Sequence, residues 1–142
     1  MALLSVILVY VWMTVGNNVI LLLAGLQGVS ETYYEAAQID GASKVRQFFS
    51  ITLPLITPTL FFVFITAMIS SLQMFDLIFI MIGDSNALLE PLRTIVYGVY
   101  ESGFKYSSMG IASAQAFLLF IAILVITIIQ FVFQKKWVHY DS

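Results

Sequence analysis

Long apolar runs alternate with short polar segments along this chain. No Asp, Glu, Lys or Arg occurs from Met1 to Ser30 or from Gln47 to Phe75, and a third uncharged run covers residues 109–133. Because a transmembrane helix needs about 20 consecutive, mostly apolar residues, these runs predict membrane spans at about 3–26, 55–82 and 107–133. We therefore expect an all-α polytopic membrane protein whose residues 1–142 form a single transmembrane domain.

The composition supports the membrane assignment. The chain is 61% hydrophobic and 10% charged, whereas soluble domains contain about 25% charged residues. A soluble protein with such helices would need amphipathic segments to cover them, and the chain has almost none. The absence of cysteine excludes a disulfide framework and thiol chemistry. The net charge of −2 is too small to indicate a nucleic-acid partner.

The basic residues predict the orientation of the spans. Four of the six Lys and Arg residues fall between the first two spans or after the third span: Lys44, Arg46, Lys135 and Lys136. Arg93 and Lys105 lie between the second and third spans. Because cytoplasmic loops carry an excess of basic residues, we expect the loop 27–54 and the C-terminus in the cytoplasm and the loop 83–106 outside.

The cytoplasmic loop is predicted to contain two short helices. Ser30 is a favourable N-cap, and Glu31 follows it in the first turn, where the helix dipole favours an acid. Gly41 ends this helix because glycine readily adopts positive φ. A second helix is expected at about 42–49.

The first of these helices carries the residues of a docking surface. Ala36 and Ala37 leave room for the side chains of a partner, and Glu35 offers a charge-assisted hydrogen bond. A connector that is only solvated would not require this order of residues, although simple solvation of Glu35 is the alternative. We therefore expect a soluble partner to contact this loop.

Seven positions in and after this helix have a fixed spacing. Glu35-Ala36-Ala37 is followed by Gly41, Ile51, Leu53 and Pro54, which gives the pattern EAA-x3-G-x9-I-x-LP. This pattern resembles the signature loop of the inner-membrane permeases of binding-protein-dependent ABC importers. The longer segment YEAAQIDGASKVRQFFSITLPLITP is most similar to the carbohydrate-uptake branch, as are LLLAGLQGV, the segment 72–76 and the closing QFxxQKKWVHY.

The resemblance implies a fold and a set of partners. Such permeases typically have six spans, so the chain would be the last three spans of a partial permease domain in a bacterial or archaeal inner (cell) membrane. The implied partners are a second homologous permease subunit, two ABC ATPase subunits, an extracytoplasmic solute-binding protein and membrane lipid. ATP and Mg²⁺ belong to the ATPases, since this chain has no Walker-type glycine loop. We therefore expect neither a cofactor nor an enzymatic activity in this chain.

The resemblance also implies roles for the residues of the loop. The loop would be a coupling element seated in a groove of the ATPase. Glu35 would supply the charged contact, Ala36 and Ala37 would pack closely, Gly41 would make the turn, and Asp40 would stabilise that turn or cap the second helix. Ile51, Leu53 and Pro54 complete the motif. The alternative function is an energy-independent secondary transporter or a channel, which would not require such a loop.

Polar residues in the spans are candidates for the path of a sugar or a related polar solute. They are Asn17, Asn18, Gln73, Asp76 and Gln115. An ionisable group inside a membrane is costly and often functional, but Asp76 can instead end the second span near the outer interface. Asn17 and Asn18 can likewise serve only to hold helices together.

The outer loop contains a second apolar piece. Residues 94–100 predict a short outer helix whose tyrosines suit the headgroup region of the membrane. Contact with the binding protein is the alternative. Within this loop, Gly83-Asp84-Ser85 departs from the Gly-Gly-Pro turn that is common in the permeases.

Overall fold

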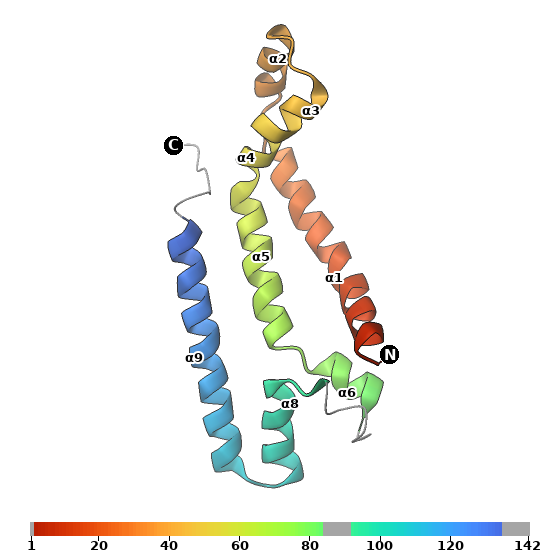
Figure 1. The fold of residues 1–142 in the computed structure, drawn as a ribbon, viewed down its shortest axis with the longest axis vertical. Helices are drawn as coiled ribbons and strands as arrows, with labels where there is room; N and C mark the ends of the chain where they lie inside the picture. The colour runs from red at the N-terminus through yellow and green to blue at the C-terminus, as the bar shows by residue number, and fades with distance from the viewer. Residues whose placement is uncertain (1, 84–91, 135–142) are drawn as a thin grey trace.

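The computed structural model describes residues 2–83 and 92–134, and every regular element within these two ranges is helical. Three long helices, α1 (Ala2–Gln27), α5 (Thr57–Leu72) and α9 (Met109–Gln134), form the body of the molecule. Figure 1 shows α5 between α1 and α9, with each neighbouring pair antiparallel. The all-α class predicted from the sequence is therefore confirmed.

Two of the long helices match the expected spans closely. Residues Leu3–Gln27 and Met109–Gln134 are each long and apolar enough to cross a membrane. Large apolar side chains cover their outer surfaces, and the side chain of Trp12 is 85% exposed. A soluble protein would bury such side chains. These surfaces therefore suit lipid or neighbouring transmembrane helices.

The region of the second expected span, 55–82, contains two helices. Helix α5 ends at Leu72, and α6 (Asp76–Ile82) starts after a short break and takes a different direction (Figure 1). The Thr94 hydroxyl donates a hydrogen bond to the Met74 carbonyl within the break, at 3.0 Å. In a continuous helix the Met74 carbonyl would accept a hydrogen bond from the backbone. At the break it accepts one from the Thr94 side chain instead.

The outer helix exists but is not exposed on all sides. Helix α8 (Ile95–Tyr100) continues as the π-helical segment η3 (Glu101–Lys105), and both pack against α9. Tyr97 is only 1% exposed and belongs to a core cluster with Val6, Ile78 and Leu92. Its hydroxyl donates to the Gly83 carbonyl at 3.3 Å. Tyr97 therefore packs inside the protein, so its ring does not face the surroundings as the sequence pattern suggested.

Helices α1 and α5 approach each other closely near the polar loop. A Cβ atom added to Gly25 would lie 2.6 Å from Thr59 Oγ1 and 2.8 Å from Thr59 Cβ. Only glycine fits this contact, which is how small residues allow membrane helices to pack tightly. The two helices are thus joined where they enter the loop.

Candidate functional site

The polar loop consists of two helical halves, which together we call the coupling segment and define as residues 31–55. It contains α2 (Glu31–Ile39), α3 (Lys44–Gln47), the π-helical segment η1 (Phe48–Thr52) and α4 (Leu53–Leu55). In Figure 1 it projects from one end of the molecule, above the ends of α1 and α5. The Tyr34 hydroxyl lies 2.8 Å from Thr52 Oγ1 and joins the two halves of the segment.

The spacing between the alanines and the glycine of the motif has a structural reason. Gly41 has a φ of 73°. Its N–H donates to the Gln38 carbonyl at 3.0 Å, and the Ala42 N–H donates to the Ala37 carbonyl at 2.9 Å. This pair of bonds is a Schellman motif, in which the residue after the C-cap is left-handed and is usually glycine. The turn that ends α2 therefore runs from Ala37 to Ala42, and Gly41 occupies its left-handed position.

Asp40 lies within this turn but does not cap the next helix. It is the C-cap residue of α2, and its N–H donates to the Ala36 carbonyl at 3.1 Å. The N-cap of α3 is Ser43, whose hydroxyl oxygen accepts from the Arg46 N–H at 3.4 Å. The sequence-based alternative that Asp40 caps the second helix is therefore wrong.

The last part of the motif continues the second loop helix. Ile51 lies in η1, while Leu53 and Pro54 lie in α4, and residues Lys44–Leu55 meet α5 at an angle of 63°. Pro58 has no N–H to donate to the Pro54 carbonyl four residues earlier. The Thr57 hydroxyl donates to that carbonyl instead, at 2.6 Å. Proline chemistry thus explains the bend between the coupling segment and α5.

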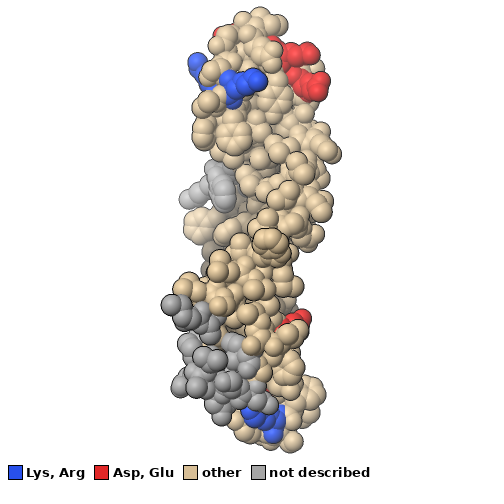
Figure 2. All heavy atoms as spheres, turned by 90° about the vertical axis from the view of Figure 1, so that its right-hand side faces the viewer, with Lys and Arg blue, Asp and Glu red and all other residues tan. Residues whose placement is uncertain are grey.

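The coupling segment has an inner and an outer side. Ala37, Asp40 and Ile51 line a cavity of about 250 Å³ between its halves; Ala37 and Ile51 are partly buried, whereas Glu35, Ala36 and Asp40 are exposed. Gln47 is buried, and its side-chain amide donates to the Ala42 carbonyl at 3.0 Å. Figure 2 shows the acidic and basic side chains of this end on separate sides. The exposed side is therefore available to a partner, while the inner side holds the segment together.

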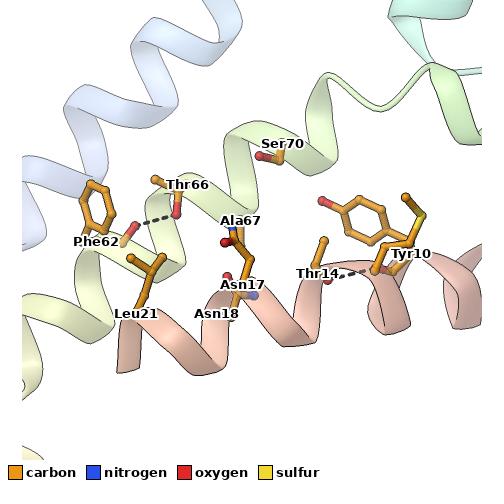
Figure 3. Close-up of a pocket in the computed structure, with 10 residues that line it drawn as sticks. Tyr10, Thr14, Asn17, Asn18, Leu21, Phe62, Thr66, Ala67 and Ser70 are labelled. Atoms are coloured by element: carbon orange, nitrogen blue, oxygen red, sulfur yellow. Dashed lines mark hydrogen bonds between the residues drawn. The ribbon is translucent and has the colours of Figure 1, made fainter. Parts of the chain in front are cut away.

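A second feature lies between the long helices. A cavity of about 340 Å³ separates α1 from α5 (Figure 3). It is lined by Tyr10, Met13, Thr14, Asn17, Asn18, Leu21, Phe62, Thr66, Ala67 and Ser70. We call it the polar cavity. It includes both asparagines that the sequence singled out.

The polar groups of this cavity differ in their partners. The Thr14 hydroxyl donates to the Tyr10 carbonyl and the Thr66 hydroxyl to the Phe62 carbonyl, both at 2.9 Å. Such bonds to the helix's own backbone leave no need for a ligand. The Tyr10 hydroxyl is buried and has no hydrogen-bond partner among the described residues. This hydroxyl and the amides of Asn17 and Asn18 are the groups best placed to bind a polar molecule.

Comparison with known proteins identifies the family. The profile of the family described as "Binding-protein-dependent transport system inner membrane component" matches residues 1–139. The chain belongs to this permease family. The resemblance read from its EAA motif is therefore confirmed.

Individual relatives agree with this membership. The probable ABC transporter permease protein YesP of Bacillus subtilis is 38% identical over 143 residues, which cover 99% of this chain and 45% of YesP. The sn-glycerol-3-phosphate transport system permease protein UgpA of Agrobacterium fabrum is 34% identical, with 98% of this chain and 47% of UgpA covered. UgpA of Brucella abortus is 35% identical, with coverage of 96% and 46%. The chain thus spans about half the length of the curated relatives it matches.

The structure does not bring the five substrate-path candidates of this permease chain together. Asn17 and Asn18 share the polar cavity. Gln73 lines a separate, mainly apolar cavity of about 200 Å³ near α8, and Gln115 lines a third cavity beside Arg93. Asp76 is exposed in the first turn of α6 and lines none of these three cavities. Asp76 lies beyond the end of α5, which fits the alternative that it ends the second span, and the dipole of α6 favours an acid in this first turn.

Sequence reasoning missed two features of this permease chain. Tyr10, Thr14 and Asn18 are spaced by four residues, a signal that would have marked one polar stripe on α1. Glu101 was not selected, yet it is buried and its carboxylate lies 2.7 Å from the guanidinium of Arg93. Lys105, four residues after Glu101, was its only local signal.

Proposed function

We propose that this chain forms part of the transmembrane subunit of an ATP-driven importer for sugars or related polar solutes. The observation that carries the proposal is the Schellman turn at Gly41, which fixes the EAA helix α2 on a helical unit that lies between α1 and α5 along the chain. The names of the relatives, an ABC transporter permease and an sn-glycerol-3-phosphate transport system permease, support both the energy source and a small polar solute.

The coupling segment would receive the movement of separate ATPase subunits. Glu35 would make the charged contact, and the exposed Ala36 would allow close packing against a groove in the partner, next to Ala37, which faces the cavity between the two halves. Asp40 and Gly41 would hold the turn, and Ile51, Leu53 and Pro54 would anchor the segment at α5. ATP and Mg²⁺ would be bound by the ATPases. Coupling requires that the segment contacts the partner differently in its two states.

A rigid coupling segment would transmit this movement to the membrane-spanning helices. The Tyr34–Thr52 hydrogen bond, at 2.8 Å, holds the two halves of the segment together. The contact between Gly25 and Thr59 holds α1 against α5 directly below. A displacement of the segment would therefore move both helices that line the polar cavity.

The polar cavity would form part of the translocation path. Asn17 and Asn18 present amide groups, and Tyr10 presents a buried hydroxyl, all of which bind solute hydroxyls well. The remainder of the path would come from a second permease subunit, and an extracytoplasmic binding protein would deliver the solute. On this proposal the coupling segment and the C-terminus are cytoplasmic; Lys135 and Lys136, which support that orientation, lie outside the described residues.

The interaction with the ATPase can be tested directly. We expect Glu35→Lys to reduce the amount of ATPase that co-purifies with the assembled permease, because the reversed charge opposes the proposed contact. Glu31→Lys is the matched control, since it reverses an exposed charge one helical turn earlier and outside the motif. Equal recovery of the ATPase with both variants would reject the proposed contact. ATP-independent uptake would instead favour a secondary transporter or a channel.

A further inference from the structure

The second helical half of the coupling segment presents apolar side chains to its surroundings. Val45, Phe48 and Phe49 follow one another at three- and four-residue spacing and lie on one side of α3 and η1. Val45 is 68% exposed and Phe49 is 62% exposed, and the rings of Phe48 and Phe49 pack edge to face. We call these three residues the apolar loop face. An exposed apolar patch with a polar border is typical of contact with a membrane or another protein.

The opposite side of this helical half is used inside the coupling segment. Gln47 is buried and donates to the carbonyl of Ala42, the residue that closes the turn after α2. Val45 and Phe49 lie two residues before and after Gln47, which places them on the far side of the helix from it. Figure 1 shows α2 at the tip of the molecule and α3 between α2 and the long helices. The apolar loop face therefore points away from the helix that carries the EAA residues.

Two cations border the apolar loop face. Lys44 and Arg46 are exposed and stand on either side of Val45 along the chain. Among the described residues, neither side chain forms an ion pair. Asp40, the acid nearest along the chain, lines the inner cavity of the segment, and no Asp or Glu occurs from residue 41 to residue 75. An apolar stripe with a basic border is typical of helices that lie in the surface of an anionic membrane.

This helical half begins close to the membrane. Helix α5 has 16 residues and is therefore about 24 Å long, which is shorter than the hydrocarbon core of about 30 Å. The membrane thus reaches residues that flank α5. Residues Lys44–Leu55 meet α5 at 63°, so they run obliquely to the bilayer, and Phe49 lies only about 9 Å along the helix from Leu55. The apolar loop face is therefore within reach of the lipid headgroups.

We propose that the apolar loop face lies in the membrane surface, with Lys44 and Arg46 on the phosphate groups of anionic phospholipids. The stem of a long basic side chain can follow an apolar surface while its charged end reaches a headgroup. The second half of the coupling segment then rests on the membrane, while α2 faces the aqueous side. The inference goes beyond the proposed function and requires only that α5 crosses the membrane.

Photochemical crosslinking in the assembled transporter tests this inference. Phe49 is replaced by p-benzoylphenylalanine, which keeps an aromatic ring at this position, and the complex is placed in nanodiscs of equal parts phosphatidylcholine and phosphatidylglycerol. We expect phospholipid adducts at position 49. We expect phosphatidylglycerol to exceed phosphatidylcholine in these adducts about fivefold or more, since each basic residue near an anionic surface strengthens the attraction about fivefold. The same label at Ile39, an exposed apolar residue on α2, should give no phospholipid adduct.

Charge variants then test the two cations. Combined Lys44→Gln and Arg46→Gln should bring the two phospholipids to nearly equal yield at position 49. Glu31→Gln, which removes an exposed charge from α2, should leave the ratio unchanged.

Three results would overturn the inference. They are adducts at position 49 with protein chains alone, equal phospholipid yields at positions 49 and 39, and a preference for phosphatidylglycerol that the double variant retains. The recovery of ATPase in the same samples reports separately on the proposed function, because Glu35 lies on α2 and outside the apolar loop face.

Discussion

The hydroxyl of Tyr34 lies 2.8 Å from Thr52 Oγ1, eighteen residues further along the chain. Thr52 is only 7% exposed. This contact joins the EAA helix α2 to the helical segment that leads into α5. The two halves of the coupling segment are therefore tied by a side-chain hydrogen bond in addition to the turn at Gly41.

Tyr34→Phe should weaken the mechanical link between the two halves. The change removes one hydrogen bond and leaves the Thr52 hydroxyl without that partner, which costs about 1 kcal/mol or slightly more. We expect more ATP hydrolysed per solute imported, with little change in the amount of assembled complex. Tyr106→Phe, the same change at an exposed tyrosine outside the coupling segment, is the control. Thr52→Val combined with Tyr34→Phe should cost less than the sum of the two single changes.

Gly25→Ala should disturb the packing of α1 on α5. The new Cβ would lie 2.6 Å from Thr59 Oγ1, and overpacking of this kind costs about 1–3 kcal/mol. We expect a lower thermal unfolding temperature of the purified permease. Gly16→Ala has nothing within 4 Å of its new Cβ and should be neutral or stabilising. Equal stability of both variants would show that the close approach at Gly25 is not needed.

Tyr10→Phe should separate a structural from a ligand-binding role of the polar cavity. The Tyr10 hydroxyl is buried without a partner among the described residues, so its removal should leave stability equal or slightly higher. If the hydroxyl binds solute, uptake falls several-fold in transport assays with radiolabelled solute. Unchanged uptake would remove Tyr10 from the proposed path.

Two of the three long helices, α1 and α9, could be predicted well from sequence because each is one long apolar run. The expected span 3–26 corresponds to α1 at Ala2–Gln27, and 107–133 corresponds to α9 at Met109–Gln134. The turn at Gly41 was also predictable, since a left-handed residue is required there and glycine adopts that conformation without strain. In each case the relevant information lies within a few residues of the feature.

Features that depend on distant partners were not predictable in the same way. Helix α5 ends at Leu72, and the Met74 carbonyl just after it accepts a hydrogen bond from Thr94, a residue twenty positions further along the chain. The burial of Tyr97 and the ion pair between Arg93 and Glu101 likewise require that α8 folds back on the other helices. A pattern of apolar residues records none of these contacts. Only part of the lining of the polar cavity could be predicted. Asn17 and Asn18 stand out in an apolar run, whereas the four-residue spacing of Tyr10, Thr14 and Asn18 is less conspicuous.

The central claim is that the coupling segment transmits ATP-driven movement to α1 and α5. It is tested most directly by measuring ATP hydrolysis and solute uptake together in proteoliposomes that contain the assembled transporter. Gly41→Val cannot adopt a φ of 73° without strain, whereas Gly41→Asn tolerates this conformation.

We predict that Gly41→Asn retains coupled uptake, while Gly41→Val loses most of the uptake but the ATPase still hydrolyses ATP. Solute uptake by Gly41→Val at the wild-type rate, with its dependence on ATP intact, would contradict the account.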